Sequence, residues 1–580
     1  MASGDASRRA RAWLLGALVL ALELLILVHL HDRFWWPPDE GVYAHPAERM
    51  LQGELLHRDV HEAHPAAHFL DEAALALFGD RLVSLRYPLA AAAVAQGLLV
   101  FLLLLPAGDL AAAAGSLATT AFGFVQYLSP QPSWYCVFLT VVAAAILRVW
   151  PPARRGRSAA LGLVAGLALL LRQLSGAFLV AALVTCLLLE AEGDERAERP
   201  LLARATAAAV LLALALYLLR STDLLGFALF GVWPLVLAAG VLWSTRLRAR
   251  AVASRLGGFA AGGFVAALPL AVYYAWHGAL GALFDDTVRG ALAVSRLPYL
   301  AGNSYAEALG AAVSQLAAHR SFGLVANGLY WLSLPFAAGV LGLLAARRLA
   351  VERRADPFVH LAVFSGLVSL LNQIPIYLYY SLTLSLPALL LAVERPRARA
   401  AASALVLGLS AIALHDHAAQ PLARGEEGVY AGARMGVVPI GIPKLGLWTD
   451  PADAAVYRAV LARIESETAA GEPIFAFPND AELYYLSGRP NPFAFFNTAL
   501  DVRTPADAAA VVAGLERAKP RLVLFVPDDK YRTPPLEPVV RFVRARYRRE
   551  ARIGRFEVYR LPGPAPAAAT WPPPPGAAAR

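Results

Sequence analysis

The first apolar run of the chain decides its class of fold: WLLGALVLALELLILVHL, residues 13–30. As a helix, these 18 residues rise about 27 Å, close to the ~30 Å hydrocarbon core of a bilayer. Arg8, Arg9 and Arg11 precede the run, which is longer than a signal-peptide core and lacks a clear small-residue cleavage site. We therefore expect a retained first membrane span.

Composition extends this expectation to most of the chain. Of the 580 residues, 58% are hydrophobic and 16% are charged, whereas soluble proteins carry about 25% charged residues. Further apolar runs of roughly 15 to 22 residues follow until His415 and then stop. The pattern predicts a polytopic all-α membrane domain over residues 1–416.

Basic clusters predict the orientation of the spans, because Arg and Lys near span ends stay in the cytoplasm. The clusters lie between apolar runs, so the formal charge of +9 reflects topology and does not indicate nucleic-acid binding. About thirteen crossings result, with a cytoplasmic N-terminus and an outer C-terminus. The expected spans are 13–30, 86–105, 110–128, 134–150, 158–171, 173–190, 204–220, 224–244, 256–276, 323–345, 357–376, 379–393 and 400–416.

This topology leaves three segments on the outer side: 31–85, 277–322 and everything after 416. Residues 417–562 read as a small non-cytoplasmic α/β domain, and residues 563–580 as a disordered Pro/Ala-rich tail. The elements expected in the domain are a helix from Asp450-Pro451, a strand over 474–477, a helix over 506–515 and a strand over 522–526. Their order resembles a βαβ unit.

A pair of adjacent carboxylates follows the first span in Phe34-Trp35-Trp36-Pro37-Pro38-Asp39-Glu40-Gly41. Tryptophans favour the membrane-water interface, and the two prolines end the helix there. Asp39 and Glu40 are thus expected at the outer lipid surface, where partial desolvation suits a carboxylate to act as a general base. Taken alone, such a pair is more often a solvated loop feature.

The residues around the pair resemble the first outer loop of the C-type (GT-C) glycosyltransferases, which use polyprenyl-phosphate sugars. The matching motifs are Asp39-Glu40-Gly41-x-Tyr43-Ala44, Gly53-Glu54-x-x-x-Arg58-Asp59, His64-Pro65, Phe78-Gly79 and Arg86, and the outer stretch Tyr484 to Pro492 is also similar. The family includes protein O-mannosyltransferases and lipid A aminoarabinose transferases. This sequence departs from the family pattern, because it lacks a charged or His residue before the final outer-facing helix. The departure puts sugar recognition in doubt.

The resemblance implies an inverting sugar transfer from a polyprenyl-phosphate donor on the outer face of the inner membrane. Asp39 matches the catalytic carboxylate and Glu40 its neighbour, and Tyr43, Arg58, Asp59, His64 and Arg86 are the expected substrate-binding residues. The acceptor stays open among protein, lipid and glycan.

Cationic groups are needed for the departing lipid phosphate. Besides Arg86, the candidates are Arg172 between two spans, and Arg289 and Arg296 in the second outer segment. An arginine beside lipid is costly, which favours a functional partner for Arg172, although snorkelling to the interface would also satisfy it. The segment 277–322 is long enough for a lid, and a mere connection is an equal alternative.

A metal site is considered and not assigned. His57, His61, His64 and His68 lie near Asp59, Glu62 and Asp71, and His64 and His68 have helical i, i+4 spacing that Pro65 interrupts. We expect no certain cofactor, while the resemblance leaves a divalent cation open. Cys136 and Cys186 lie inside apolar runs, so they support neither a disulfide nor a thiolate metal site.

Two alternatives from other classes remain. A transporter or lipid flippase would share the many spans, but it would place ionisable groups near the membrane midplane and often shows internal repeats. A non-catalytic relative would use the outer domain to bind a partner.

Overall fold

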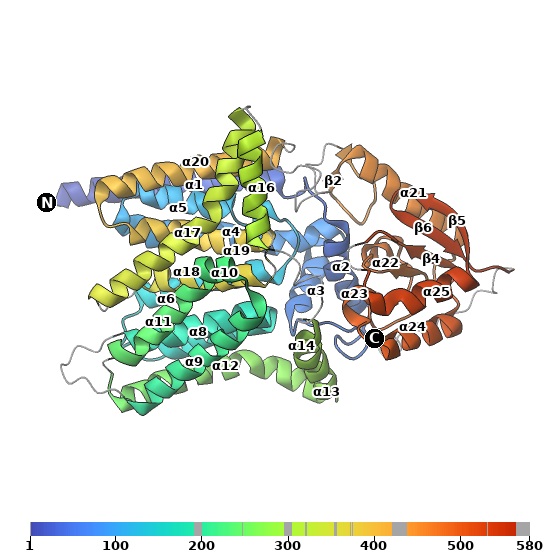
Figure 1. Cartoon of the computed structure of the whole chain (residues 1–580), viewed down its shortest axis with the longest axis horizontal. Helices are drawn as coiled ribbons and strands as arrows, with labels where there is room; N and C mark the ends of the chain where they lie inside the picture. Colours follow the sequence, from blue (N-terminus) through green and yellow to red (C-terminus); the bar gives the residue numbers. More distant parts are fainter. Residues whose placement is uncertain are drawn as a thin grey trace.

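A computed structural model describes the chain except residues 1, 191–199, 246, 295–303, 319–321, 353–355, 372, 374, 420–437, 530–531 and 564–580. The described residues form a bundle of long helices with a smaller domain of helices and strands at one end (Figure 1). Arg296 and residues 564–580 of the predicted tail lie outside the described residues.

Long apolar helices make up the bundle. Eight helices among the described residues are long and apolar enough to cross a membrane. They are residues Ala10–Leu30 of α1 (Ala2–Leu30), Leu82–Ala107 around α4 (Arg86–Leu104), α6 (Pro132–Val149), α9 (Leu201–Ser221), Leu224–Ser244 ending in α11 (Val232–Ser244), α12 (Ala249–Trp276), Leu332–Glu352 of α17 (Phe322–Glu352) and Pro396–Leu414 of α20 (Pro396–Ala419). Four shorter apolar helices accompany them: α7 (Arg157–Leu171), α8 (Gln173–Leu189), Pro357–Leu370 including α18 (Pro357–Ser365), and α19 (Pro375–Ala392).

The predicted fold class, a polytopic helical membrane domain with a C-terminal domain, is confirmed. The long and short apolar helices correspond to twelve of the expected spans. The remaining one, 110–128, contains α5 (Asp109–Ala121), whose 13 residues give a helix of only about 20 Å. The number of crossings and the sides on which the termini lie stay predictions.

Side-chain exposure distinguishes the outer surface of the bundle from its inside. Leu14, Leu18 and Leu25 of α1 are 74%, 66% and 65% exposed, as expected for leucines that face lipid. Inside, small residues let helices approach closely. A Cβ atom on Gly162 of α7 would lie 1.9 Å from the backbone oxygen of Phe259 on α12, so only glycine allows this helix pair.

The first outer segment forms two helices, α2 (Pro37–Leu51) and α3 (Ala67–Phe78), which lie between the bundle and the C-terminal domain (Figure 1). The prolines that were expected to end the first span also begin α2, since Pro37 and Pro38 occupy its first two positions. Asp39 and Glu40 fall in the first turn, where the helix dipole favours negative charge. The acidic pair therefore belongs to a helix and not to a flexible loop.

The C-terminal domain contains a mixed four-stranded sheet with the order β3-β4-β6-β5. Its strands are β3 (Phe475–Phe477), β4 (Leu522–Phe525), β5 (Arg548–Ile553) and β6 (Phe556–Arg560), and only β3 and β4 pair in parallel. The helices are α21 (Pro451–Glu467), α22 (Glu482–Ser487), α23 (Thr498–Asp501), α24 (Pro505–Ala518) and α25 (Glu537–Arg546), and β1 (Val438–Pro439) pairs with β2 (Trp448–Thr449).

Part of this domain agrees with the sequence-based expectation. Helices α21 and α24 and strands β3 and β4 lie where they were predicted, and the parallel β3-β4 pair fits a βαβ unit. The hairpin β5-β6 and helix α25 were not predicted. Strand β5 is mostly exposed and rich in arginine, so it lacks the buried apolar alternation on which a strand prediction depends.

The second outer segment is helical where it is described. It contains α13 (Leu280–Phe284), the π-helix Asp285–Gly290, α14 (Ala291–Val294) and α16 (Tyr305–Ala318). Its predicted function as a lid stays a prediction.

Candidate functional site

Asp39 lies at the centre of a hydrogen-bonded network at the end of the bundle that adjoins the C-terminal domain, whose predicted position is on the outer side of the membrane. Its Oδ2 accepts a short hydrogen bond from the hydroxyl of Tyr127. Gln131 donates to the same hydroxyl at 3.3 Å and accepts from the hydroxyl of Tyr43 at 2.8 Å. Asp39 is partly exposed. The network fixes the carboxylate in one orientation while leaving it open to a ligand.

Glu40 lies in a different environment from its neighbour. Its side chain is fully buried, and it pairs with the fully buried Arg86 at 2.6 Å. Arg86 also donates to the backbone oxygens of His31 and Phe34, both at 2.5 Å. The backbone N–H of Trp36 donates to Glu40 at 3.0 Å. Consecutive positions on a helix point about 100° apart, so Glu40 anchors α2 while Asp39 faces the site.

The partners of Arg86 bear on its expected role in phosphate binding. Its guanidinium is enclosed by a carboxylate and two carbonyls of the protein and has no exposed surface. Phosphate binding by Arg86 stays a prediction, and this geometry favours a positioning role instead.

Arg172 is a buried cation of another kind. It lies at the junction of α7 and α8 and is 9% exposed. Its guanidinium donates to the hydroxyl of Ser133 and, at 3.2 Å, to that of Tyr377. No carboxylate of the described chain lies within 4.0 Å of it. Because its described partners are neutral hydroxyls, Arg172 has a charge that an anionic ligand can balance.

Residues 127–133, which lead into the first turn of α6, join the two halves of the site. Tyr127 and Gln131 belong to the Asp39 network, and Ser133, two positions later, bonds to Arg172. Site roles for Tyr127, Gln131 and Ser133 were not predicted from the sequence. The feature that could have indicated them is the polar stretch Ser129-Pro130-Gln131-Pro132-Ser133 between two apolar runs, because a short turn between two spans can approach the site.

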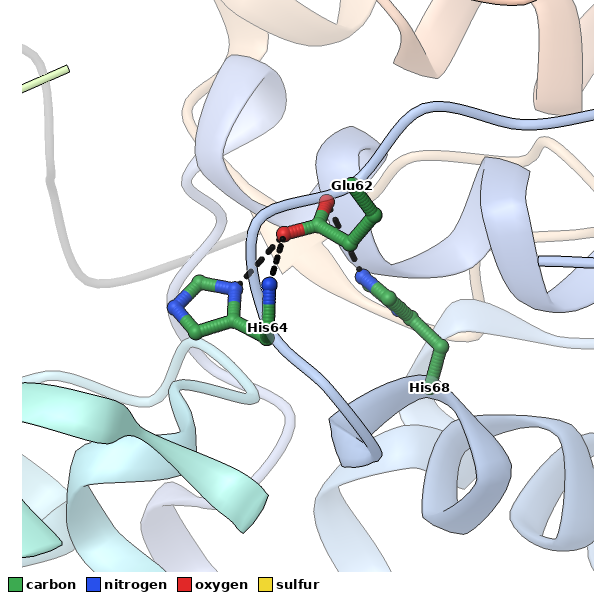
Figure 2. A group of neighbouring side chains, drawn as sticks. All are labelled: Glu62, His64 and His68. Atoms are coloured by element: carbon green, nitrogen blue, oxygen red, sulfur yellow. Dashed lines mark hydrogen bonds and ion pairs between the residues drawn. The ribbon is translucent and has the colours of Figure 1, made fainter. Parts of the chain in front are cut away.

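Glu62, His64 and His68 form a compact cluster beside this network (Figure 2). A Glu62 oxygen lies 2.7 Å from Nδ1 of His64, and its other oxygen lies 3.1 Å from Nε2 of His68. Asp71 approaches the far side of His68 at 3.1 Å. The rings of His68 and Tyr43 have centroids 5.7 Å apart, so the cluster adjoins the Asp39 network.

These residues fit a divalent cation. One ligand atom from each of the three lies within 4.8 Å of the others, and two imidazoles with one carboxylate are a common set for Zn²⁺ with an open fourth position. Pro65 was the reason not to assign a metal from sequence. Helix α3 begins only at Ala67, so His64 reaches Glu62 from the loop and helical spacing is not required.

In the absence of a cation, a proton holds the cluster together. Burial lowers the pKa of His68, but the charges of Glu62 and Asp71 outweigh it and raise that pKa to about 10. For Glu62 the effects are reversed. Burial raises the pKa of this carboxyl, but His68 and His64 outweigh burial and hold the pKa well below its usual range. A cation would have to displace the proton of His68.

The other predicted substrate-binding residues lie apart from the Asp39 network. Arg58 and Asp59 form a two-bonded pair with each other, at 3.0 and 2.8 Å. Arg289 is 72% exposed and pairs with Asp285 at 2.6 Å. Of the predicted residues, Asp39 and Tyr43 share one hydrogen-bonded network, Arg172 is linked to it through residues 127–133, and His64 belongs to the neighbouring cluster.

Two solved structures are similar to this chain. Both are ArnT from Cupriavidus metallidurans, one in the apo state and one bound to undecaprenyl phosphate. The apo structure is 15% identical, with a TM-score of 0.37 over 95% of this chain and 98% of that chain. For the bound structure the values are 16%, 0.38, 94% and 97%.

No family model matches the sequence, and no curated protein matches it. We therefore take the function from the chemistry of the site.

Replacing Arg86 by Met is expected to destabilise the protein by about 3–5 kcal/mol, because it leaves Glu40 buried and unpaired. Thermal unfolding of the full chain in detergent measures this, with exposed Arg81→Met as the control. The double variant Glu40→Gln/Arg86→Met should recover part of the loss. An unchanged unfolding temperature, together with weaker undecaprenyl phosphate binding, would instead return Arg86 to phosphate recognition.

The cluster of Figure 2 is expected to bind Zn²⁺, and His68→Ala is expected to abolish that binding. Metal analysis of the purified protein after equilibration with Zn²⁺ and removal of excess should detect one ion per chain in the wild type and in exposed His277→Ala. Uptake should weaken as the pH falls, because protons compete for the imidazoles. Equal metal content in His68→Ala and wild type would refute the site.

Proposed function

We propose that the protein is an inverting glycosyltransferase that acts on the outer face of the inner membrane. It transfers a sugar from a polyprenyl-phosphate-linked donor to an acceptor hydroxyl or amine. The proposal rests on one observation above all. A partly exposed carboxylate, Asp39, and a buried guanidinium without a described carboxylate partner, Arg172, are linked through the same short segment, residues 127–133.

Asp39 supplies the base. The acceptor attacks the anomeric carbon of the donor sugar, and its proton passes to the carboxylate of Asp39 as the new bond forms. The bond from the anomeric carbon to the phosphate oxygen breaks on the opposite side, and its electron pair leaves with the lipid phosphate. One displacement of this kind inverts the configuration at the carbon. Tyr127 and Gln131 hold the carboxylate in place, which lowers the cost of orienting it.

Arg172 supplies the positive charge for the leaving group. Negative charge grows on the phosphate as the bond breaks, and a guanidinium fixed in a buried site stabilises this charge strongly. The hydroxyls of Ser133 and Tyr377, which now accept from Arg172, can donate to phosphate oxygens. This charge pattern needs no nucleotide-binding loop.

A small cavity with a largely apolar lining adjoins Ser133, a hydroxyl partner of Arg172. It lies between α6, α8, α18 and α19, and Phe178, Leu179, Val368 and Leu384 line it. Its volume of about 20 Å³ holds no more than a water-sized group, so it does not bear on the hydrocarbon chain of the donor.

A divalent cation held by Glu62, His64 and His68 would add positive charge on the outer side of the site. The chain's own residues in that cluster are close enough to Tyr43 to influence the Asp39 network. The identities of the sugar and the acceptor do not enter the argument.

Asp39→Asn is expected to lower sugar transfer at least 100-fold, because general base catalysis contributes about 10²–10⁴-fold. Membranes containing the protein are supplied with undecaprenyl-phosphate hexoses as probe donors, and released undecaprenyl phosphate is measured. Asp528→Asn, in an exposed turn of the outer domain, is the matched control. A transporter would bind these probes without releasing lipid phosphate, so bound donor with no release in wild type would favour transport.

Arg172→Ala is expected to weaken binding of undecaprenyl phosphate by 10-fold or more, since a charged hydrogen bond is worth about 1.5–3 kcal/mol. Titration of the detergent-purified protein with this lipid measures the affinity. Arg552→Ala removes an exposed arginine of the C-terminal domain that pairs with Asp528 and should bind as wild type. Equal affinity of Arg172→Ala and wild type, with an unchanged unfolding temperature, would reject the phosphate role.

A further inference from the structure

The outer domain and helix α2 share one hydrophobic core. Tyr43, Ala47 and Met50 of α2 belong to the same buried cluster as Tyr457 and Phe556 of the outer domain. At the start of this helix, the ring of Trp35 lies 4.3 Å from that of Tyr457. At such distances the two parts cannot move independently without opening a packed core.

Helix α2 and the C-terminal domain approach each other closely two residues after Asp39. A Cβ atom on Gly41 would fall 2.2 Å from the backbone nitrogen of Glu482 and 2.6 Å from its Cα. The backbone of Glu482 is therefore seated directly on the turn of α2 that bears Asp39. Any shift of Glu482 changes the space available to that turn.

Glu482 belongs to a buried group whose charges do not balance. Its carboxylate, which has no exposed surface, accepts from the hydroxyl of Tyr457 at 2.8 Å and from Arg555 at 3.1 Å. The same Nη2 atom of Arg555 also donates to Asp480 at 2.7 Å. One guanidinium thus serves two buried carboxylates, and the second negative charge stays uncompensated unless a proton neutralises it.

The carboxyls differ in how tightly they keep that proton. Burial raises the pKa of Glu482 to about 8, with a further increase from Asp480 and a decrease from Arg555. Burial raises the pKa of Asp480 to about 6, again against the effect of Arg555. Burial and the repulsion between the two carboxylates therefore favour one proton on the pair near neutral pH, while Arg555 compensates the remaining charge.

Every neighbouring element contributes to this balance. Tyr457 faces the group from α21, Arg555 from the β5-β6 turn, and Asp529 from the turn after β4. On the side of α2, Gly41 is flanked by Glu40, whose charge is paired with Arg86, and His45 and Arg49 follow further along the helix.

We propose that protonated Glu482 is a positioning residue that holds helix α2, and with it Asp39, against the outer domain. When the proton leaves, an uncompensated negative charge lies buried against Gly41, and the contact loosens. The functional importance of Asp39 in this proposal rests on the proposed function. The linkage between Glu482 and α2 does not depend on it.

The direction of the pH effect follows from the raised pKa. A carboxyl whose pKa is higher in the folded protein stabilises the fold fully below its usual value of 4.5, and it loses this contribution progressively until the pH reaches about 8. The contact between the C-terminal domain and α2 should therefore weaken as the pH rises toward 8 and change little above it.

Hydrogen exchange of the full chain in detergent tests this linkage. Peptides covering residues 37–51 are followed by mass spectrometry from pH 6 to 9, after correction for the intrinsic pH dependence of exchange. Between pH 6 and about 8, opening of α2 in the wild type should increase by up to about ten-fold per pH unit, the limit for one linked proton, and it should level off above pH 8. Glu482→Gln should abolish the increase. Exposed Glu465→Gln, on the same domain, should behave as wild type.

A second variant keeps the test decisive if Glu482→Gln does not fold. Asp480→Asn leaves Arg555 to neutralise Glu482 alone. The increase in α2 opening with pH should therefore also disappear in this variant. A wild type without the increase, or folded variants that keep it, would overturn the proposal.

The exchange measurement requires no sugar donor, which separates this inference from the proposed function. If α2 opens as expected but no transfer occurs with the probe donors, the proposed function fails and the linkage stands. If Asp39-dependent transfer occurs while α2 exchange stays flat, the positioning role fails. In an active enzyme, Glu482→Gln should also extend kcat to higher pH without a matching change in KM.

Discussion

The pairing of Glu40 with Arg86 holds together the part of the molecule where three helices meet. Arg86 begins α4, binds carbonyls at the end of α1, and receives the carboxylate that α2 places in its first turn. Two buried charges are costly unless both are satisfied, and here the carbonyls and the Trp36 amide take up the remaining hydrogen-bonding capacity. With Glu40 fixed on the inside, helical geometry turns Asp39 to the other side, toward Tyr127.

The two buried arginines near the site differ in whether a carboxylate of the protein neutralises their charge, and this difference favours a structural role for one and ligand binding for the other. Arg86 has a carboxylate at salt-bridge distance, whereas Arg172 is surrounded by hydroxyls and an aromatic ring of Tyr377. A charge that is already neutralised gains little from an incoming phosphate. A charge held by neutral donors and acceptors gains much, because the ligand replaces weak partners with a strong one.

This difference also marks the limit of sequence-based prediction. The apolar runs predicted the helices of the bundle, since a lipid solvent leaves few other structures for such segments. The amphipathic patterns predicted α21 and α24, whereas the assignment of Asp39 as the base from its motif stays a prediction. The roles of Arg86 and Arg172 depend on partners 46 and 39 residues away in the sequence, which no local pattern encodes. The meeting of His64 and His68 at Glu62 depends likewise on the fold of the loop before α3.

The C-terminal domain, for which the sequence indicated no definite role, is the part whose secondary structure was least completely predicted from the sequence. Its hairpin β5-β6 carries Arg555 at the turn and Phe556 in the core shared with α2. Strand β5 lacks apolar alternation because its outer face is solvated. The residues that reach α2 are therefore embedded in a segment that reads as polar surface.

The shared core has a consequence for biosynthesis. Tyr43 is made early, while its core partners Tyr457 and Phe556 come from the last part of the described chain. At a synthesis rate of about 5–20 residues per second, α2 waits on the order of 20 to 100 s before the surface that completes its packing exists. During that interval the apolar helices of the bundle exist, but α2 has not completed its core. The packing of α2 is therefore finished only after the C-terminal domain has folded, and a chain truncated before that point would carry Asp39 on an unsupported helix.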